Sequence, residues 1–171
     1  LRLKKVAKLA ELNRPQEPKP PFPYKSEEVS YENAAAKVKL GGTLTLPKEG
    51  GPHPVVLMIT GSGQQDRDET LLGHKPFLVI ADYLTRRGIA VLRVDDRGMG
   101  KSTGNFGAST TYDFADDVQA GVEYLKTRKD IDPKRIGLIG HSEGGVVAPI
   151  VASKSKDVAF IDRKSTRLNS S

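Results

Sequence analysis

The sequence predicts an α/β fold in which helices cover both faces of a mostly parallel sheet. Short apolar runs typical of buried strands alternate with longer segments whose apolar residues recur at helical spacing. Such alternation favours right-handed β–α–β crossovers, which make neighbouring strands parallel. Two segments near the start, 26–33 and 37–47, alternate enough to form an antiparallel strand pair, so we expect the sheet to be mixed.

The remaining elements follow in chain order. Residues 54–60 (PVVLMIT) form a continuous apolar run bounded by Pro54 and Gly61, which suits a fully buried strand. A helical face over 77–84 ends at Gly88, a good C-terminal stop. The further elements expected are a strand at 89–94, a helix at 111–128, a strand at 135–140, a helix at 142–152 and the start of a strand at 157–161.

Three segments of the chain differ in character. Residues 1–24 are expected to form an N-terminal helix and a Pro-rich linker. The helix is interpreted as the end of a preceding domain, with a membrane-surface helix as the alternative. Residues 25–161 form a partial α/β domain. Residues 162–171 (DRKSTRLNSS) match the translation of a common sequencing-library adapter, so we interpret them as a non-native tail rather than a natural polar one.

The distribution of charge argues against nucleic acid as a partner. The formal net charge is +6, but residues 25–161 carry 18 positive and 18 negative side chains, so the excess belongs to the two ends. No apolar run approaches the length of a membrane span. The chain has no cysteine, which excludes disulfides and Cys-ligated metals, and we expect neither a metal nor a cofactor.

The segment Gly140-His141-Ser142-Glu143-Gly144 matches the G-x-S-x-G nucleophile elbow. A sharp turn from strand into helix holds the serine in a strained conformation, and side chains two residues away would collide with the neighbouring elements. An apolar strand ends at the first glycine and an apolar helix follows Ser142, which favours a nucleophile over an idle serine in a Gly-rich turn. The Glu143 N–H would then lie at a helix N-terminus, where it can stabilise an oxyanion.

A second oxyanion donor is expected from the loop that follows strand 54–60. We assign the N–H of Ser62, with Gly63 as the neighbour that could take the role; a plain Gly-rich turn is the alternative. The loop does not fit a dinucleotide fingerprint, because position 66 is Asp66 and the third glycine is missing.

Four segments in the same order resemble bacterial carboxylesterases of the serine α/β-hydrolase superfamily. They are ITGSGQQDRDE, RGIAVLRVDDRGMGKSTG, DFADDVQAGVEYL and RIGLIGHSEGG. The resemblance implies the N-terminal portion of that fold, with its last strands missing, and hydrolysis of a small-molecule ester through an acyl-enzyme on Ser142. Some similar proteins cleave peptides or thioesters. It also implies that Arg97 is structural and pairs with a nearby carboxylate such as Asp95 or Asp66.

Two functions from other classes are alternatives to ester hydrolysis. Gly98–Ser102 ends in Gly-Lys-Ser like a phosphate-binding loop, but the glycine required at position 95 is Asp95, which disfavours nucleotide binding. The other reading is a non-catalytic binding module that keeps the pocket without a triad.

A base and an acid for Ser142 are missing. The three histidines are His53, His74 and His141, and none follows Ser142, whereas this fold orders its triad as serine, acid, histidine. We expect His141 to pack or hydrogen-bond nearby rather than act as the base. The acid and the histidine are therefore expected outside this chain. Alone, the chain should show little turnover and low stability.

Overall fold

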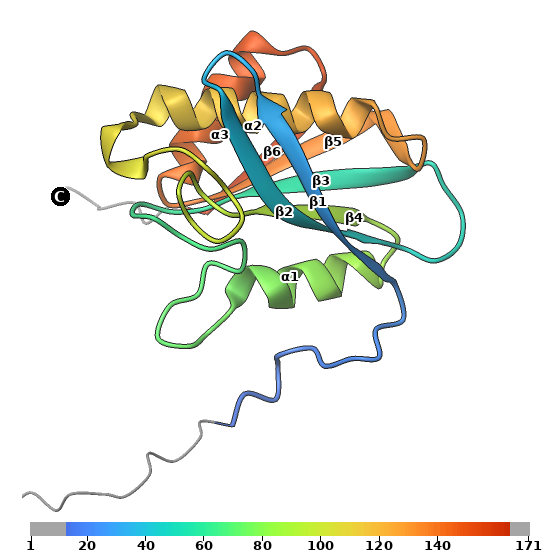
Figure 1. Ribbon diagram of the computed structural model, residues 1–171. Coiled ribbons are helices and arrows are strands. Elements are labelled where there is room, and N and C mark those ends of the chain that lie inside the picture. Colours follow the sequence, from blue (N-terminus) through green and yellow to red (C-terminus); the bar gives the residue numbers. More distant parts are fainter. Residues whose placement is uncertain (1–12, 165–171) are drawn as a thin grey trace, which may run out of the picture.

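The computed structural model describes residues 13–164, and these residues form a six-stranded sheet with helices on both faces (Figure 1). The strands are β1 (Lys25–Asn33), β2 (Val38–Leu46), β3 (His53–Ile59), β4 (Ala90–Val94), β5 (Ile131–His141) and β6 (Val158–Lys164). The helices are α1 (Pro76–Thr85), the short 3-10 helix η1 (Phe106–Ala108), α2 (Thr111–Lys126) and α3 (Gly144–Lys154). Across the sheet the order is β1-β2-β4-β3-β5-β6.

The direction of the strands confirms the mixed, mostly parallel sheet. β1 pairs antiparallel with β2, and β2 pairs antiparallel with β4. From β4 onward, β3, β5 and β6 are all parallel to their neighbours. The carboxyl ends of β3, β4 and β5 therefore meet at one edge of the sheet, which is where ligands bind in such folds.

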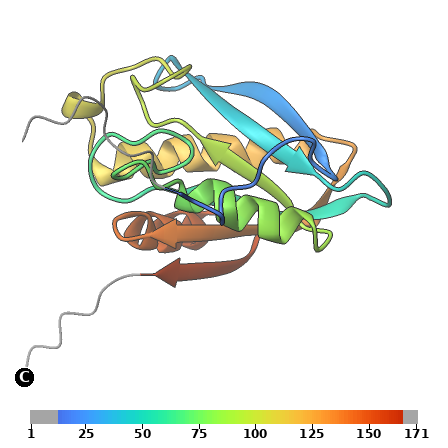
Figure 2. The same ribbon diagram turned by 90° about the horizontal axis from the view of Figure 1, so that it is seen from below.

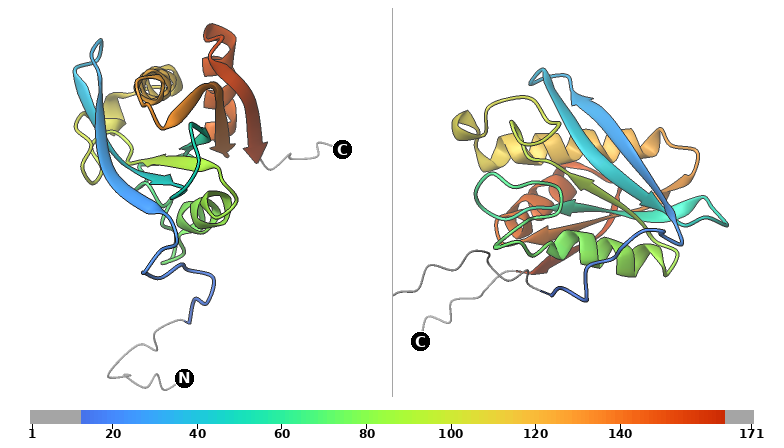
Figure 3. Two further views of the ribbon diagram at one scale, coloured as in Figure 1. Left: turned by 90° about the vertical axis from the view of Figure 1, so that its right-hand side faces the viewer. Right: turned by 60° about the horizontal axis from the view of Figure 1, so that its bottom comes forward.

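Helices cover the two faces unequally. α1 packs against β4 and β2 on one face, whereas α2 and α3 pack on the other, as the side view of Figure 3 shows. The larger core lies under α2 and α3 and includes Leu57, Leu92 and Leu138. A smaller cluster lies under α1, where Phe77 and Ala81 meet the sheet. The predicted fold class is confirmed.

Local signals determine where the helices begin and end. Thr110 caps α2: its N–H donates to the Asp113 carboxylate at 2.8 Å, and its hydroxyl accepts from the Asp113 N–H. After α1, Gly88 takes a φ of +89°, a left-handed conformation that glycine adopts without steric cost. The stop predicted at Gly88 is therefore observed.

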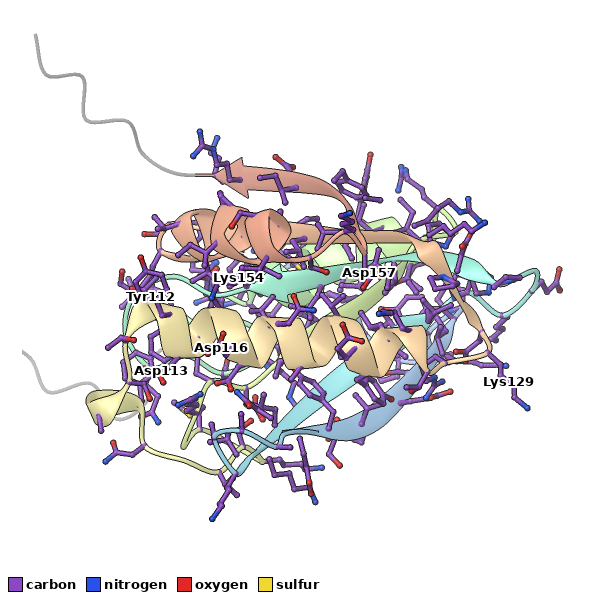
Figure 4. All side chains as sticks on the ribbon, turned by 90° about the horizontal axis from the view of Figure 1, so that it is seen from above. Tyr112, Asp113, Asp116, Lys129, Lys154 and Asp157 are labelled. Carbon is purple, nitrogen blue, oxygen red and sulfur yellow. The ribbon has the colours of Figure 1, made fainter. Side chains whose placement is uncertain are left out.

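Polar contacts join α2 to α3 along their exposed sides. Figure 4 shows Lys154 of α3 beside Tyr112 and Asp116 of α2. The Lys154 ammonium lies 5.7 Å from the centroid of the Tyr112 ring and 3.7 Å from the Asp116 carboxylate. Exposed contacts of this kind contribute little energy each, so the buried core decides how the two helices pack.

Residues 13–24 contain no helix or strand, but they are attached to the domain. Figure 2 shows this segment running beside α1. Tyr24 is buried, and its hydroxyl donates to the Asp82 carboxylate at 2.9 Å. Arg14 donates to the Leu72 carbonyl at 2.7 Å. Most of the helix predicted at the N-terminus lies in 1–12, outside the described residues.

β6 forms the edge of the sheet and is longer than the predicted stub at 157–161. It continues through Lys164, into the segment interpreted from the sequence as a non-native tail, and that interpretation stays a prediction. Phe160 packs over Gly137 of β5. Phe160 and Ile161 nevertheless remain 49% and 38% exposed, so apolar surface lies open at this edge.

Gly121 sets how closely α2 approaches the sheet, and Gly121→Val should destabilise the protein by about 2 kcal/mol. A Cβ at this position would lie 2.6 Å from the Leu57 side chain and 2.8 Å from the Tyr31 hydroxyl. Ala120→Val, a half-buried neighbour on the same helix, is the matched control and should cost under about 1 kcal/mol. Urea unfolding of the two variants measures the difference; equal stabilities would contradict the proposed packing role.

Candidate active site

Ser142 lies in the turn between β5 and α3 and is exposed to solvent. Its φ is +49°, a left-handed conformation that costs a non-glycine residue about 1–3 kcal/mol. The two glycines of the motif explain why the turn can be so tight. A Cβ at Gly140 would fall on the Gly144 carbonyl oxygen, and a Cβ at Gly144 would fall on the Ile59 carbonyl oxygen. The serine side chain is therefore presented at the carboxyl edge of the sheet by a strained turn.

The loop after β3 touches this turn. A Cβ added to Gly61 would lie 3.2 Å from the Ser142 Cβ, so the two segments are in contact. Ser62, the next residue, is exposed. Glu143 is the N-cap residue of α3, where the helix dipole favours negative charge. Among the turn and loop hydrogen bonds of residues 13–164, neither the Ser62 N–H nor the Glu143 N–H donates to a backbone oxygen.

Glu69 joins the loop to the turn, and the sequence did not single it out. It is 6% exposed and has a φ of +52°. One carboxylate oxygen accepts the Gly61 N–H at 2.7 Å and lies 2.7 Å from His141 Nδ1. His141 is half exposed and uses this nitrogen for Glu69, in keeping with the hydrogen bond expected of it.

Asp96 holds the same loop from the other side. Its two carboxylate oxygens accept the Thr60 hydroxyl and the Gln65 N–H, each at 2.7 Å. Burial raises the pKa of Asp96 to about 6 despite these two donors, and nearby carboxylates add to the rise. The segment that carries Ser62 is thus held at Gly61 through Glu69, and at both Thr60 and Gln65 through Asp96.

Arg97 corrects one expectation. It pairs with Asp117 on the buried face of α2, with Nη2 and Oδ1 2.9 Å apart, and not with Asp95 or Asp66. Asp95 instead accepts from Arg67 at 2.7 Å, because the loop after β3, which carries Arg67, contacts the start of the loop after β4. Arg97 does play the structural role expected of it, since it ties the loop after β4 to α2.

In the loop Gly98–Ser102, both donors of Lys101 bind carboxylates of the protein itself. The Lys101 N–H donates to the Asp95 carboxylate at 3.0 Å, and the Lys101 ammonium pairs with Glu28 at 2.7 Å. A phosphate-binding loop would leave both groups to the ligand. This geometry speaks against nucleotide binding here.

No base is in position at Ser142 within residues 13–164. His53 is buried at the amino end of β3, away from the serine, and His74 lies in the loop before α1. Asp157 pairs with Lys126 at the amino end of β6. In the same residues, no three His, Asp or Glu side chains gather closely enough to hold a metal ion. None of the described helices combines the length and the apolar character needed to cross a membrane.

Comparison with known proteins gives consistent matches. The Hydrolase_4 family model, described as "Serine aminopeptidase, S33", matches residues 75–161, just over half of the chain. Esterase EstD of Thermotoga maritima is 37% identical over 117 residues, which cover 68% of this chain and 28% of EstD. The chain spans less than half of the length of the curated relatives that it matches.

Two solved structures share the fold. The Pyrococcus furiosus esterase Pf2001 is 30% identical with a TM-score of 0.62, and the match covers 82% of this chain and 51% of Pf2001. Est1E of Butyrivibrio proteoclasticus, solved with ferulic acid bound, is 26% identical with a TM-score of 0.62, covering 76% of this chain and 49% of Est1E.

The contact between Gly144 and Ile59 predicts that Gly144→Ala destabilises the protein by about 2–3 kcal/mol. The new methyl group would overlap the Ile59 carbonyl oxygen, which belongs to the buried strand β3 and has little room to move. In Gly107→Ala the methyl group would meet nothing closer than 3.6 Å, so this control should stay within about 0.5 kcal/mol of wild type. Chemical denaturation distinguishes the two; a Gly144→Ala protein as stable as the control would disprove the steric constraint.

Asp96 predicts a pH-dependent loss of stability. Because its folded pKa is about 6 and its ordinary value 3.8, its carboxyl ionises in the unfolded chain before it does in the folded one. The contribution of Asp96 to the free energy of unfolding is therefore complete below about pH 4, and it is lost as the pH rises through 6. Relative to Asp96→Asn, wild type should lose about 3 kcal/mol across this window.

The measurement is the free energy of unfolding of both proteins at several pH values. The prediction concerns how the difference between the two free energies of unfolding changes with pH, so a constant difference caused by the amide does not affect the test. Asp116→Asn, at a side chain that is 62% exposed, serves as the control and should run parallel to wild type. Parallel curves for Asp96→Asn as well would show that Asp96 ionises normally.

Proposed function

Because the chain belongs to the Hydrolase_4 family of α/β-hydrolases, we propose that it carries the nucleophile and the oxyanion hole of a carboxylic ester hydrolase. The observation that carries the proposal is the strained, exposed Ser142 at the carboxyl edge of the sheet, where it touches the loop after β3. Strain of this kind persists only where the surrounding structure enforces it, and it gathers at functional sites.

In the proposed reaction the Ser142 hydroxyl oxygen attacks the ester carbonyl carbon while a base takes its proton. The carbonyl oxygen becomes an oxyanion and accepts the N–H groups of Ser62 and Glu143. When the bond to the alcohol breaks, the alcohol leaves with the proton and the acyl group stays on Ser142. A water molecule, activated by the same base, then releases the carboxylic acid and restores the serine.

The base and its orienting acid are proposed to lie outside this sequence. No histidine follows Ser142, and in this fold the acid and the histidine come after the serine. The chain also spans only 28% of the length of EstD and about half of the length of Pf2001 and of Est1E. The 171-residue chain alone should therefore hydrolyse esters several orders of magnitude more slowly than the full-length protein.

The ester is the preferred substrate class because EstD and Pf2001 are both named esterases. Peptide hydrolysis is the second candidate, favoured by the description of the family model as a serine aminopeptidase. Both reactions use the same nucleophile and oxyanion hole, so the leaving group alone separates them.

Replacing Ser142 by Ala in the full-length protein should reduce kcat/KM for 4-nitrophenyl acetate by at least about 10⁴-fold, because the acyl-enzyme can no longer form. Ser153→Ala, an exposed serine on α3, is the matched control and should keep wild-type activity. Initial rates and mass spectrometry of an acyl adduct on residue 142 provide the measurement. Wild-type rates in Ser142→Ala would refute the nucleophile.

A further inference from the structure

The two backbone N–H groups proposed for the oxyanion hole come from segments that are far apart in the chain. Ser62 lies in the loop after β3, and Glu143 lies at the start of α3. An oxyanion hole is effective only if its donors are fixed before the reaction, because reorienting them in the transition state costs free energy. A contact between the loop and the turn must therefore keep the two donors in register.

Gly61, which precedes Ser62, cannot provide this register by its own conformation. Glycine is the most permissive residue of the backbone, so the direction of the N–H that follows it needs support from outside. The surroundings also leave little space for a side chain here. A Cβ at this position would lie 3.2 Å from each of three atoms: Glu69 Oε1, His141 Nδ1 and the Ser142 Cβ. Two of these three neighbours are polar groups that can form hydrogen bonds.

One oxygen of the Glu69 carboxylate connects the loop to the turn. It accepts the Gly61 N–H at 2.7 Å and lies 2.7 Å from Nδ1 of His141. An ionised carboxylate has no hydrogen to donate, so the His141 ring donates from Nδ1. Gly61 directly precedes the proposed donor Ser62, and His141 directly precedes the proposed nucleophile. A single carboxylate oxygen thus fixes the residue before each of these two groups.

The loop holds Glu69 firmly enough for this role. Its backbone has a φ of +52°, and its side chain is 8% exposed. The residues on either side of it donate their N–H groups to the Asp66 carboxylate, Asp68 at 3.0 Å and Thr70 at 2.9 Å. Asp68 also pairs with the buried Arg93 of β4. A strained backbone persists only where its surroundings enforce it, and here hydrogen bonds fix both neighbours of the strained residue.

We propose that Glu69 is a positioning residue that aligns the Ser62 N–H with the nucleophile elbow by accepting a hydrogen bond from each segment. The inference rests on the proposed ester hydrolysis at Ser142 and adds the residue that sets the geometry of its oxyanion hole. In this role Glu69 does not touch the substrate. Its removal therefore weakens the stabilisation of the oxyanion and leaves the groups that bind the ester in place.

The test measures kcat and KM of the full-length protein for 4-nitrophenyl acetate. Glu69→Ala should lower kcat about 10- to 100-fold, because a misplaced donor stabilises the oxyanion poorly. Acylation and deacylation both pass through an oxyanion, so both steps should slow alike and KM should stay within about threefold of wild type. Glu69→Gln keeps an oxygen that can accept both hydrogens, and it should restore kcat to within about fivefold of wild type.

Asp82→Ala is the matched control for an effect of stability alone. The Asp82 carboxylate also joins two segments of the chain through two donors, the Tyr24 hydroxyl at 2.9 Å and Arg86 at 2.8 Å. It lies on α1, outside the loop and the turn, so its removal should lower the thermal stability while kcat stays within about twofold of wild type. Thermal unfolding of both variants is measured beside the kinetics.

Two variants of His141 keep the test decisive if Glu69→Ala does not fold. His141→Asn offers an amide N–H near the position of Nδ1, whereas His141→Leu has no donor. We expect His141→Asn to be faster than His141→Leu in kcat by about fivefold or more. Where Glu69→Ala folds, adding His141→Leu to it should slow kcat by less than about threefold further, because the two side chains act through one contact.

The outcomes separate the two proposals. If esters are hydrolysed through Ser142 but Glu69→Ala keeps kcat within about threefold of wild type, the positioning role is wrong and the proposed function stands. The same conclusion follows if Glu69→Ala acts on KM instead of kcat, if Glu69→Gln or the Asp82→Ala control is as slow as Glu69→Ala, or if the two His141 variants are equally slow. If Ser142→Ala is as active as wild type, or no ester is hydrolysed, the proposed function fails and this inference falls with it.

Discussion

The turn at Ser142 and the strand β3 approach so closely that their backbones leave no room for a side chain between them. The Gly144 backbone packs directly on the Ile59 carbonyl, and Gly140 packs on Gly144. This close approach also brings the loop after β3 against the turn, because Ile59 is the last residue of β3 and Gly61 follows it by two positions. The proposed pairing of the Ser62 and Glu143 N–H groups depends on this contact between the loop and the turn. The geometry of the candidate site thus follows from one steric constraint between two glycines and a buried strand.

Three carboxylates keep the surrounding loops in place. Glu69 accepts the Gly61 N–H, Asp96 accepts the Gln65 N–H, and Asp95 accepts the N–H groups of Arg67 and Lys101. Hydrogen bonds to a charged acceptor contribute about 1.5–3 kcal/mol each. For Asp96, part of this gain is offset by the cost of burying the carboxylate, which is why its pKa rises to about 6.

Properties that depend on neighbouring residues could be predicted from the sequence. The alternation of apolar runs and helical faces predicts the strands and helices, and the spacing of Gly140 and Gly144 predicts the tight turn, because both are local backbone effects. Glu69 could not be found this way, since it meets His141 across 72 positions of the chain. The predicted partner of Arg97 was wrong for the same reason, because Asp117 reaches Arg97 only once α2 is packed on the sheet.

Tyr24 has a consequence for how the domain can be shortened. The linker ends in a buried aromatic ring whose hydroxyl donates to Asp82 of α1. Burial and this carboxylate raise the pKa of Tyr24 to about 12, so the phenol keeps its proton at any ordinary pH. Trimming that stops before residue 24 preserves the anchor between linker and helix. Trimming by one residue more would remove this buried ring and leave the Asp82 carboxylate with Arg86 as its side-chain donor, so the shortest stable form of the domain should begin at Tyr24, one residue ahead of the first strand.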